Sequence, residues 1–96
     1  MAEKKVRVRN NTTDGTSVRV FVDHLNPAIR AVFDVQSGAQ QQNNHMTTGH
    51  RGFIVYDDFQ EKVILTGDFV LAGTNVQISI QGDAASGYSF NIAIFI

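Results

Sequence analysis

The chain has no cysteine, no tryptophan and a single proline, and each absence narrows the class of structure. Without cysteine there is neither a disulfide framework nor a thiolate metal site. No apolar run approaches the roughly 20 residues that a membrane-spanning helix needs, and the opening Met-Ala-Glu-Lys-Lys lacks the apolar core of a secretory signal. We therefore expect a cytoplasmic protein, or one exported without a conventional signal peptide.

Sustained helical periodicity is also missing, and short alternating runs take its place. Side chains of a strand point alternately to opposite faces, so apolar residues at every second position indicate a half-buried strand. Such runs span 5–10, 17–23, 29–35, 52–56, 62–66, 69–71, 76–80 and 88–96. Short strands separated by turns are typical of a sandwich. We predict one domain, residues 1–96, folded as an all-β, antiparallel two-sheet β-sandwich of seven or eight strands.

The turns and the last run refine this prediction. The first two runs, joined by Asp14-Gly15, are expected to form a hairpin, and Thr66-Gly67-Asp68 is expected to form a turn. The last run alternates large apolar residues up to Ile96, which predicts an interior strand or one that pairs with another subunit. The predicted core is Val6, Val8, Val18, Val20, Val22, Phe33, Val35, Phe53, Val55, Val63, Leu65, Val76, Ile78, Ile80, Phe90, Ile92 and Ile94.

The segment from Gln36 to His50 interrupts the alternation. Six of its residues are Gln or Asn, and Met46 is its one strongly apolar side chain. We predict a long loop, which serves either as a binding loop or as flexible filler.

The motifs of catalysis are missing. His45 and His50 do not have the spacing of a helical metal site, and neither a phosphate-binding glycine loop nor a Gly-x-Ser-x-Gly elbow occurs. We predict no enzyme, no catalytic residues and no metal site. Calcium is the weaker alternative, because carboxylate oxygens are its preferred ligands and four carboxylates fall in expected turns: Asp57, Asp58, Asp68 and Asp83.

Sugar binding is the sharpest functional hypothesis that the residues allow. Amide, imidazole and carboxylate groups bind sugar hydroxyls through fixed donors and acceptors, and an aromatic ring can stack on the apolar face of a sugar. The candidate site residues are Gln42, Asn43, Asn44, His45, His50, Tyr56, Asp57 and Asp58, with Tyr56 or Tyr88 as the ring. We predict a lectin-like, carbohydrate-binding homo-oligomer without a cofactor, because multivalency compensates for weak single sites.

Two alternatives remain open. Ile64, Phe95 and Ile96, predicted to lie opposite the core, could hold subunits together in a structural, self-assembling protein. The run from Lys4 to Arg9 could dock on an anionic membrane surface, or it could be an edge strand kept soluble by its charge. A net charge of −1 argues against nucleic acid as a partner.

Part of the chain resembles the C-terminal β-sandwich domain of thiol-activated, cholesterol-dependent cytolysins. The resemblance rests on Phe69-Val-Leu-Ala-Gly-Thr-Asn-Val-Gln-Ile78 and on Ala31-Val-Phe-Asp-Val35. The family's Trp-rich, Cys-containing membrane loop would fall near Asp83 to Phe90, where this chain has neither residue type. The resemblance therefore implies a sandwich of that shape, without cholesterol binding or membrane docking.

Overall fold

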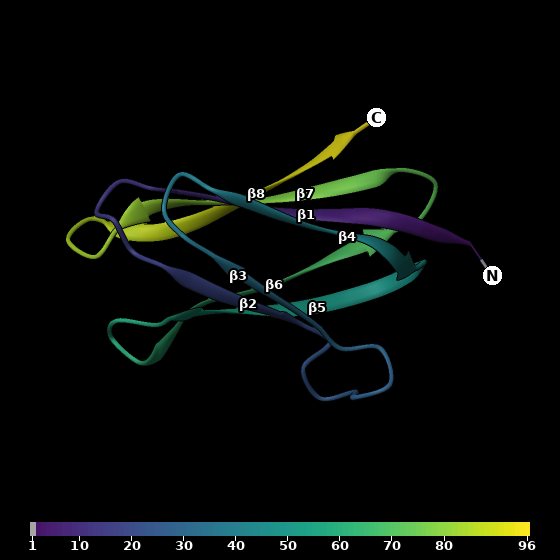
Figure 1. The fold of residues 1–96 in the computed structure, drawn as a ribbon, viewed down its shortest axis with the longest axis horizontal. Coiled ribbons are helices and arrows are strands. Elements are labelled where there is room, and N and C mark those ends of the chain that lie inside the picture. The colour runs from purple at the N-terminus through teal and green to yellow at the C-terminus, as the bar shows by residue number, and fades with distance from the viewer. Residues whose placement is uncertain (1) are drawn as a thin grey trace.

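The computed structural model describes residues 2–96, which form two four-stranded sheets packed face to face (Figure 1). The first sheet has the order β4-β1-β7-β8 and the second β3-β2-β5-β6. The strands are β1 Glu3–Thr12, β2 Val18–Val22, β3 Ala31–Val35, β4 Gln40–Thr47, β5 Gly49–Asp57, β6 Lys62–Leu71, β7 Asn75–Asp83 and β8 Gly87–Phe95. Residues 2–96 contain no helix of the length and apolar character that crossing a membrane requires. The predicted all-β, two-sheet sandwich is confirmed.

One strand pair departs from the predicted antiparallel arrangement. Five of the six pairs are antiparallel, but β1 and β7 run parallel, with Val6 opposite Val76. β1 therefore lies inside its sheet between β4 and β7, and the interpretation of Lys4 to Arg9 as a charged edge strand is wrong. Val6 and Val8 face the core, while Lys5, Arg7 and Arg9 alternate with them.

The predicted hairpin between the first two runs is also wrong. β1 and β2 belong to different sheets, and the five residues between them carry the chain from one layer to the other. Gly15 does adopt a positive φ of 78°, as the Asp-Gly pair suggested. The period of two identifies a strand, but it carries no information about which sheet the strand joins.

The segment from Gln36 to His50 is not a loop. Residues 40–47 form β4 and residues 49–50 begin β5, so that only residues 36–39 and Thr48 lie outside the strands. β4 is the edge strand of its sheet and pairs only with β1, so almost all its side chains are exposed and Met46 alone is buried. An edge strand can form through backbone hydrogen bonds without an apolar face. The sequence of β4 therefore lacks the alternation of apolar and polar residues that marks the other strands.

The core is mostly the predicted one. Twelve of the predicted residues are buried, and Leu65, Phe90 and Ile92 pack against them half-buried. Val63 and Ile94 are exceptions, being 48% and 71% exposed. The prediction missed four buried apolar residues: Ala31, Met46, Phe69 and Leu71.

Irregular pairing of β6 explains part of this difference. The register between β5 and β6 shifts after Val55, so that Val55 faces Leu65 but Tyr56 faces Val63. The extra residue, Ile64, reverses the order of inward and outward side chains. Ile64 consequently packs against the core, contrary to its predicted place on the opposite face, and Val63 turns outward.

Gly67 lies within β6 and not in the predicted turn. A Cβ atom there would stand 2.7 Å from ring carbons of both Phe53 and Phe90. The two rings pack edge to face with centroids 5.2 Å apart, an arrangement favoured between aromatic side chains. The glycine makes room for this ring pair, and β6 continues through it.

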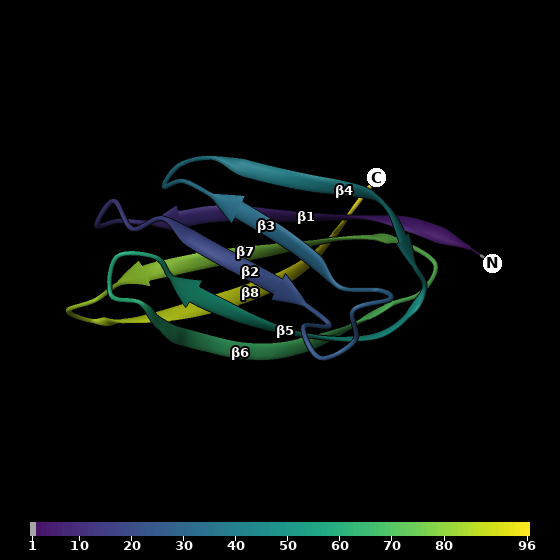
Figure 2. The same ribbon diagram turned by 60° about the horizontal axis from the view of Figure 1, so that its bottom comes forward.

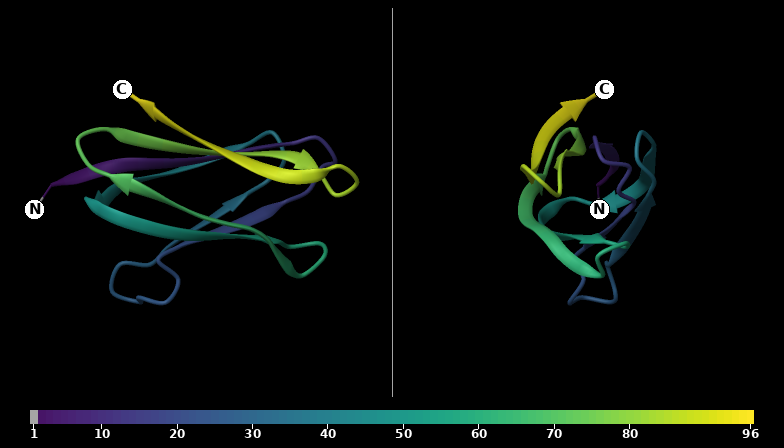
Figure 3. Two further views of the ribbon diagram at one scale, coloured as in Figure 1. Left: turned by 180° about the vertical axis from the view of Figure 1, so that it is seen from behind. Right: turned by 90° about the vertical axis from the view of Figure 1, so that its left-hand side faces the viewer.

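The last strand, β8, is an edge strand and not an interior one. It pairs with β7 alone. Figure 2 shows β3 and β4 along one long side of the sandwich and β6 and β8 along the other. The final residues of β8 rise away from the second sheet (Figure 3), which explains why Ile94 is exposed although it shares the inward parity of Phe90 and Ile92.

Candidate functional site

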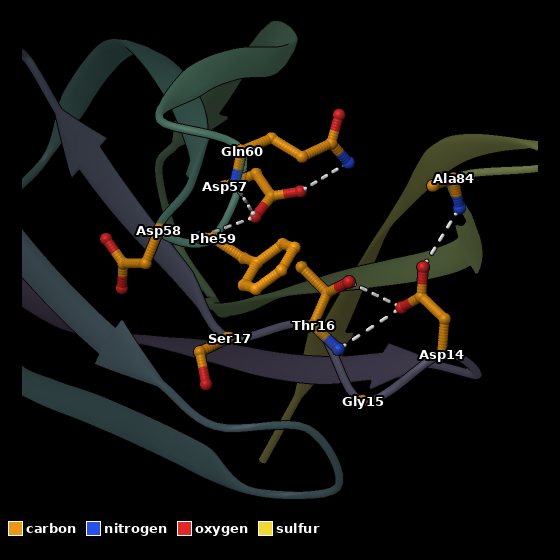
Figure 4. A pocket seen from close by; sticks show the side chains of 9 residues that line it. All are labelled: Asp14, Gly15, Thr16, Ser17, Asp57, Asp58, Phe59, Gln60 and Ala84. Carbon is orange, nitrogen blue, oxygen red and sulfur yellow. Dashed lines mark hydrogen bonds between the residues drawn. The ribbon is translucent and has the colours of Figure 1, made fainter.

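Four turns meet at one end of the sandwich, at the left of Figure 1, which we call the loop end. They are residues 13–17, 36–39, 58–61 and 84–86, which join β1 to β2, β3 to β4, β5 to β6 and β7 to β8. Three of these turns surround a hollow of about 680 Å³ (Figure 4). Its lining residues are Asp14, Gly15, Thr16, Ser17, Asp57, Asp58, Phe59, Gln60 and Ala84.

Asp57 ends β5 and shapes the turn that follows. It is only 1% exposed. Its Oδ1 accepts hydrogen bonds from the backbone N–H groups of Phe59 and Gln60 at 2.8 and 3.1 Å, and its Oδ2 accepts one from the Gln60 side chain at 2.8 Å. An aspartate that binds the backbone two residues ahead stabilises a turn. The direction of Phe59 is therefore set by a buried, fully bonded carboxylate.

Asn10 anchors the neighbouring turn between β1 and β2. It is fully buried, and its Nδ2 donates to the carbonyl groups of Thr16 and Val35 at 2.7 and 3.0 Å. Its Oδ1 accepts from the backbone and the hydroxyl of Thr12 at 3.0 and 2.7 Å. A buried polar group with all its partners in place makes the surrounding backbone rigid. Asn10 thus connects β1, β3 and the turn in one network.

Asp14 links that turn to β8. Its carboxylate accepts from the backbone and hydroxyl of Thr16 at 3.2 and 2.5 Å, from the backbone N–H of Ala84 at 2.9 Å and from the Tyr88 hydroxyl at 3.0 Å. These hydrogen bonds, chiefly that of the Thr16 hydroxyl and next that of Ala84, lower the pKa of Asp14 from 3.8 to about 2. Partial burial raises the pKa of Tyr88. The hydroxyl therefore stays protonated and can donate its hydrogen bond.

The hollow also contains groups that these networks leave free. The Phe59 ring is 91% exposed, and Figure 4 shows it between the Asp57 turn and Thr16. The Ser17 hydroxyl and the Asp58 carboxylate take no part in the hydrogen bonds described above, and Gln60 uses only its Nε2, so its carbonyl oxygen is free to accept. The arrangement offers one apolar ring face with several hydrogen-bonding groups around it.

The eight residues predicted as a site do not form one site. Asp57 and Asp58 lie in the loop-end hollow. Four of them, Gln42, Asn43, Asn44 and His45, line a separate hollow of about 570 Å³ between β3 and β4. His50 lies toward the opposite end, with its Nε2 3.1 Å from an oxygen of Asp68. Tyr56 stands opposite Arg19 on a neighbouring strand of the second sheet.

Sequence reasoning missed the aromatic group of the loop end. Tyr88 was one of two expected stacking rings, but its hydroxyl is engaged by Asp14, and the exposed ring is Phe59. A phenylalanine directly after Asp57-Asp58 in an expected turn was the available indication, because a turn offers little burial for a large apolar side chain. Ser17 and Gln60 were missed because only the fold brings their turns together.

The four carboxylates considered for calcium are not gathered at one place. Asp57, Asp58 and Asp83 belong to the loop end, whereas Asp68 lies on β6 opposite Gly52. Both oxygens of Asp57 accept hydrogen bonds from the turn. Across residues 2–96 no group of three or more His, Cys, Asp or Glu side chains is placed to hold a metal ion.

No family model and no curated protein matches the chain. The resemblance to the cytolysin domain therefore stays a prediction.

Proposed function

We propose that the chain is a non-enzymatic carbohydrate-binding module whose site is the loop-end hollow. The observation that carries the proposal is Phe59, whose ring is 91% exposed while its backbone is held by Asp57. Burying a phenylalanine side chain stabilises a protein by about 1.5–3 kcal/mol. Because Phe59 is exposed, the folded chain lacks this stabilisation. An uncovered ring on a backbone position that is held in place, at the border of a hollow, is suited to stack on the apolar face of a sugar.

The groups beside the ring fit the hydroxyls of a sugar. Each sugar hydroxyl donates one hydrogen bond and accepts others, so it needs acceptors as well as donors. The Asp58 carboxylate can accept from two neighbouring hydroxyls, and the free Gln60 carbonyl oxygen can accept from a third. The Ser17 hydroxyl can donate or accept.

The charge of the hollow narrows the class of sugar. Its lining contains Asp14, Asp57 and Asp58, and no lysine or arginine is among the described residues that line it. A sulfated or acidic sugar would be repelled by this set. A neutral sugar, or one that carries an amino group, is the expected ligand.

The state of these carboxylates favours binding over hydrolysis. Most glycosidases use a pair of carboxyl groups, one of them a general acid with a raised pKa. Asp14, with its pKa lowered to about 2, stays ionised near neutral pH, and the oxygens of Asp57 are occupied by the turn. Asp58 is left without a suitable partner acid.

The first experiment is a glycan array probed with purified, tag-free protein, followed by calorimetric titration of a sugar that binds. We expect hits that share a neutral or amino sugar. Phe59→Ala should weaken binding about tenfold or more, which corresponds to the loss of about 1.4 kcal/mol or more of stacking and burial.

Two control variants locate the site. Leu25→Ala removes an apolar side chain that is 87% exposed at the opposite end, and it should leave affinity unchanged. Asn43→Ala combined with Asn44→Ala alters the hollow between β3 and β4. If this double variant abolished binding while Phe59→Ala did not, the sugar site would lie on β4 and our placement would be wrong. An array without hits would overturn the proposed function.

A further inference from the structure

The free edge of β8 lacks every feature that commonly protects an edge strand. Exposed edges are kept from pairing by charged side chains, proline, bulges or short length. β8 has nine residues, none charged and none proline, and its register with β7 is continuous from Asn75↔Phe95 to Asp83↔Gly87. Its outer backbone groups are therefore available over the whole strand.

The other three edge strands are each protected. β3 has only five residues, and its Asp34 is paired with Arg19. β4 has an irregular register with β1 between Lys4 and Val6. β6 carries the bulge at Ile64. The contrast identifies β8 as the strand able to accept a partner.

The core is also incompletely covered along this side. Phe90 and Ile92 are only half-buried, and Ile94 is 71% exposed. A strand added next to β8 would cover apolar side chains that water now reaches, so pairing would gain hydrophobic free energy as well as backbone hydrogen bonds.

The sequence of β8 is complementary to itself when reversed about Asn91. In an antiparallel pair centred there, residues whose numbers lie equally far from 91 stand opposite one another. Phe90 then faces Ile92 of a second copy, and Tyr88 faces Ile94 of that copy, which are the aromatic and β-branched pairs that stabilise sheets. Ser89 faces Ala93, two small residues, and Asn91 faces itself, so that the amides can bond as in stacked amide ladders. This match, together with the absence of charge, favours a second copy of β8 over a charged strand of another protein.

We propose that two copies of the chain associate by antiparallel pairing of β8 with β8 about a two-fold axis at Asn91. The two four-stranded sheets that contain β8 then become one continuous sheet of eight strands. The interface is the same surface patch on both subunits, as a two-fold axis requires. It places the loop ends of the two subunits at opposite ends of the dimer, so the proposed sugar sites take no part in the contact.

The decisive test uses the symmetry of position 91. Asn91→Lys and Asn91→Asp each place two like charges opposite one another at the axis, because residue 91 faces its own copy. Sedimentation equilibrium of the full-length protein should show a dimer for the wild type and a dissociation constant raised at least tenfold for each variant. An equimolar mixture of the two variants should dimerise again, since lysine then faces aspartate.

The matched controls are Asn44→Lys and Asn44→Asp, which change an exposed asparagine on β4, the other edge of the same sheet. They should dimerise like the wild type. Far-UV circular dichroism checks that every variant is folded. The proposal is overturned if the wild type stays monomeric at high concentration, if the Asn91 variants dimerise unchanged, or if their mixture remains monomeric.

Discussion

The two ends of the sandwich hold their turns in different ways. At the loop end, three of the four turns have a side-chain anchor: Asp57 holds its turn through backbone N–H groups, Asp14 binds Thr16 and Ala84, and Asp83 accepts from the backbone and hydroxyl of Ser86 at 2.6 Å each. At the opposite end, the single side chain of Arg51 contacts two turns. Anchoring is thus distributed at one end and concentrated at the other.

Arg51 is the common partner of those two turns. It is 8% exposed, and its guanidinium donates to the carbonyl and hydroxyl of Thr47 at 2.6 Å each and to the carbonyl of Thr48 at 3.2 Å. Its Nη1 also lies 3.4 Å from Oδ2 of Asp23, an atom without a hydrogen bond among the described residues. The comparison teaches that an end with several separate anchors tolerates damage better, because the loss of one anchor leaves the other anchors in place.

The largest expected effect is at the concentrated end. Arg51→Ala should lower the free energy of unfolding by about 3–5 kcal/mol, since removing one partner of a buried ion pair leaves Asp23 charged and uncompensated. Urea denaturation measures this change. Arg19→Ala is the matched control, because the Arg19–Asp34 pair is 43% and 66% exposed and such surface pairs contribute about 1 kcal/mol or less. Equal losses for the two variants would contradict the central role of Arg51.

A smaller and more local effect is expected at the loop end. Asp57→Ala removes the acceptor of two backbone N–H groups and should cost about 1–3 kcal/mol. Hydrogen exchange should become faster at the amides of Phe59 and Gln60, while the turn held by Asp14 keeps its protection. Asp58→Ala serves as the control with an exposed neighbouring carboxylate. Loss of protection in every loop-end turn would show that the anchors are not independent.

The smallest effect is a pH dependence. Because the folded state lowers the pKa of Asp14 from 3.8 to about 2, the stabilisation from its ionised form is complete above about pH 4 and is lost as the pH falls toward 2. The pKa of Asp83 is lowered as well, chiefly by the Ser86 hydroxyl. The urea midpoint of the wild type should therefore fall across this range, and Asp14→Asn should show a shallower fall. Parallel curves for the two proteins would argue against this role of Asp14.

The sequence predicted the strands in which apolar and polar residues alternate strongly. The prediction failed for strands and irregularities that depend on backbone hydrogen bonding. Val18, Val20 and Val22 marked β2 correctly, because a half-buried strand must repeat every second residue. β4 was missed because it is held mainly by backbone hydrogen bonds to β1. Its exposed Gln and Asn side chains show no apolar alternation that would indicate a strand. Ile64 was placed on the wrong face because a bulge has no clear pattern of its own.

The candidate site was predicted only in part. Asp57 and Asp58 were identified from their residue type, and they do lie in the loop-end hollow. Gln42 to His45 were grouped with them because sequence proximity was taken for spatial proximity. Ser17 and Phe59 became neighbours of one hollow only through the crossing of the chain between the sheets, which no local pattern encodes.

The parallel contact between β1 and β7 has a consequence for the time course of folding. Arg7 and Gln77 stand side by side although 70 residues separate them. Closing so large a loop lowers the conformational entropy of the chain. This loss comes before the stabilising contacts between β1 and β7 can form. A growing chain therefore carries β1 with one edge unpaired until β7 has been synthesised, and folding should be slow and late. Over that interval the nascent protein depends on Lys5, Arg7 and Arg9 to discourage premature association of β1.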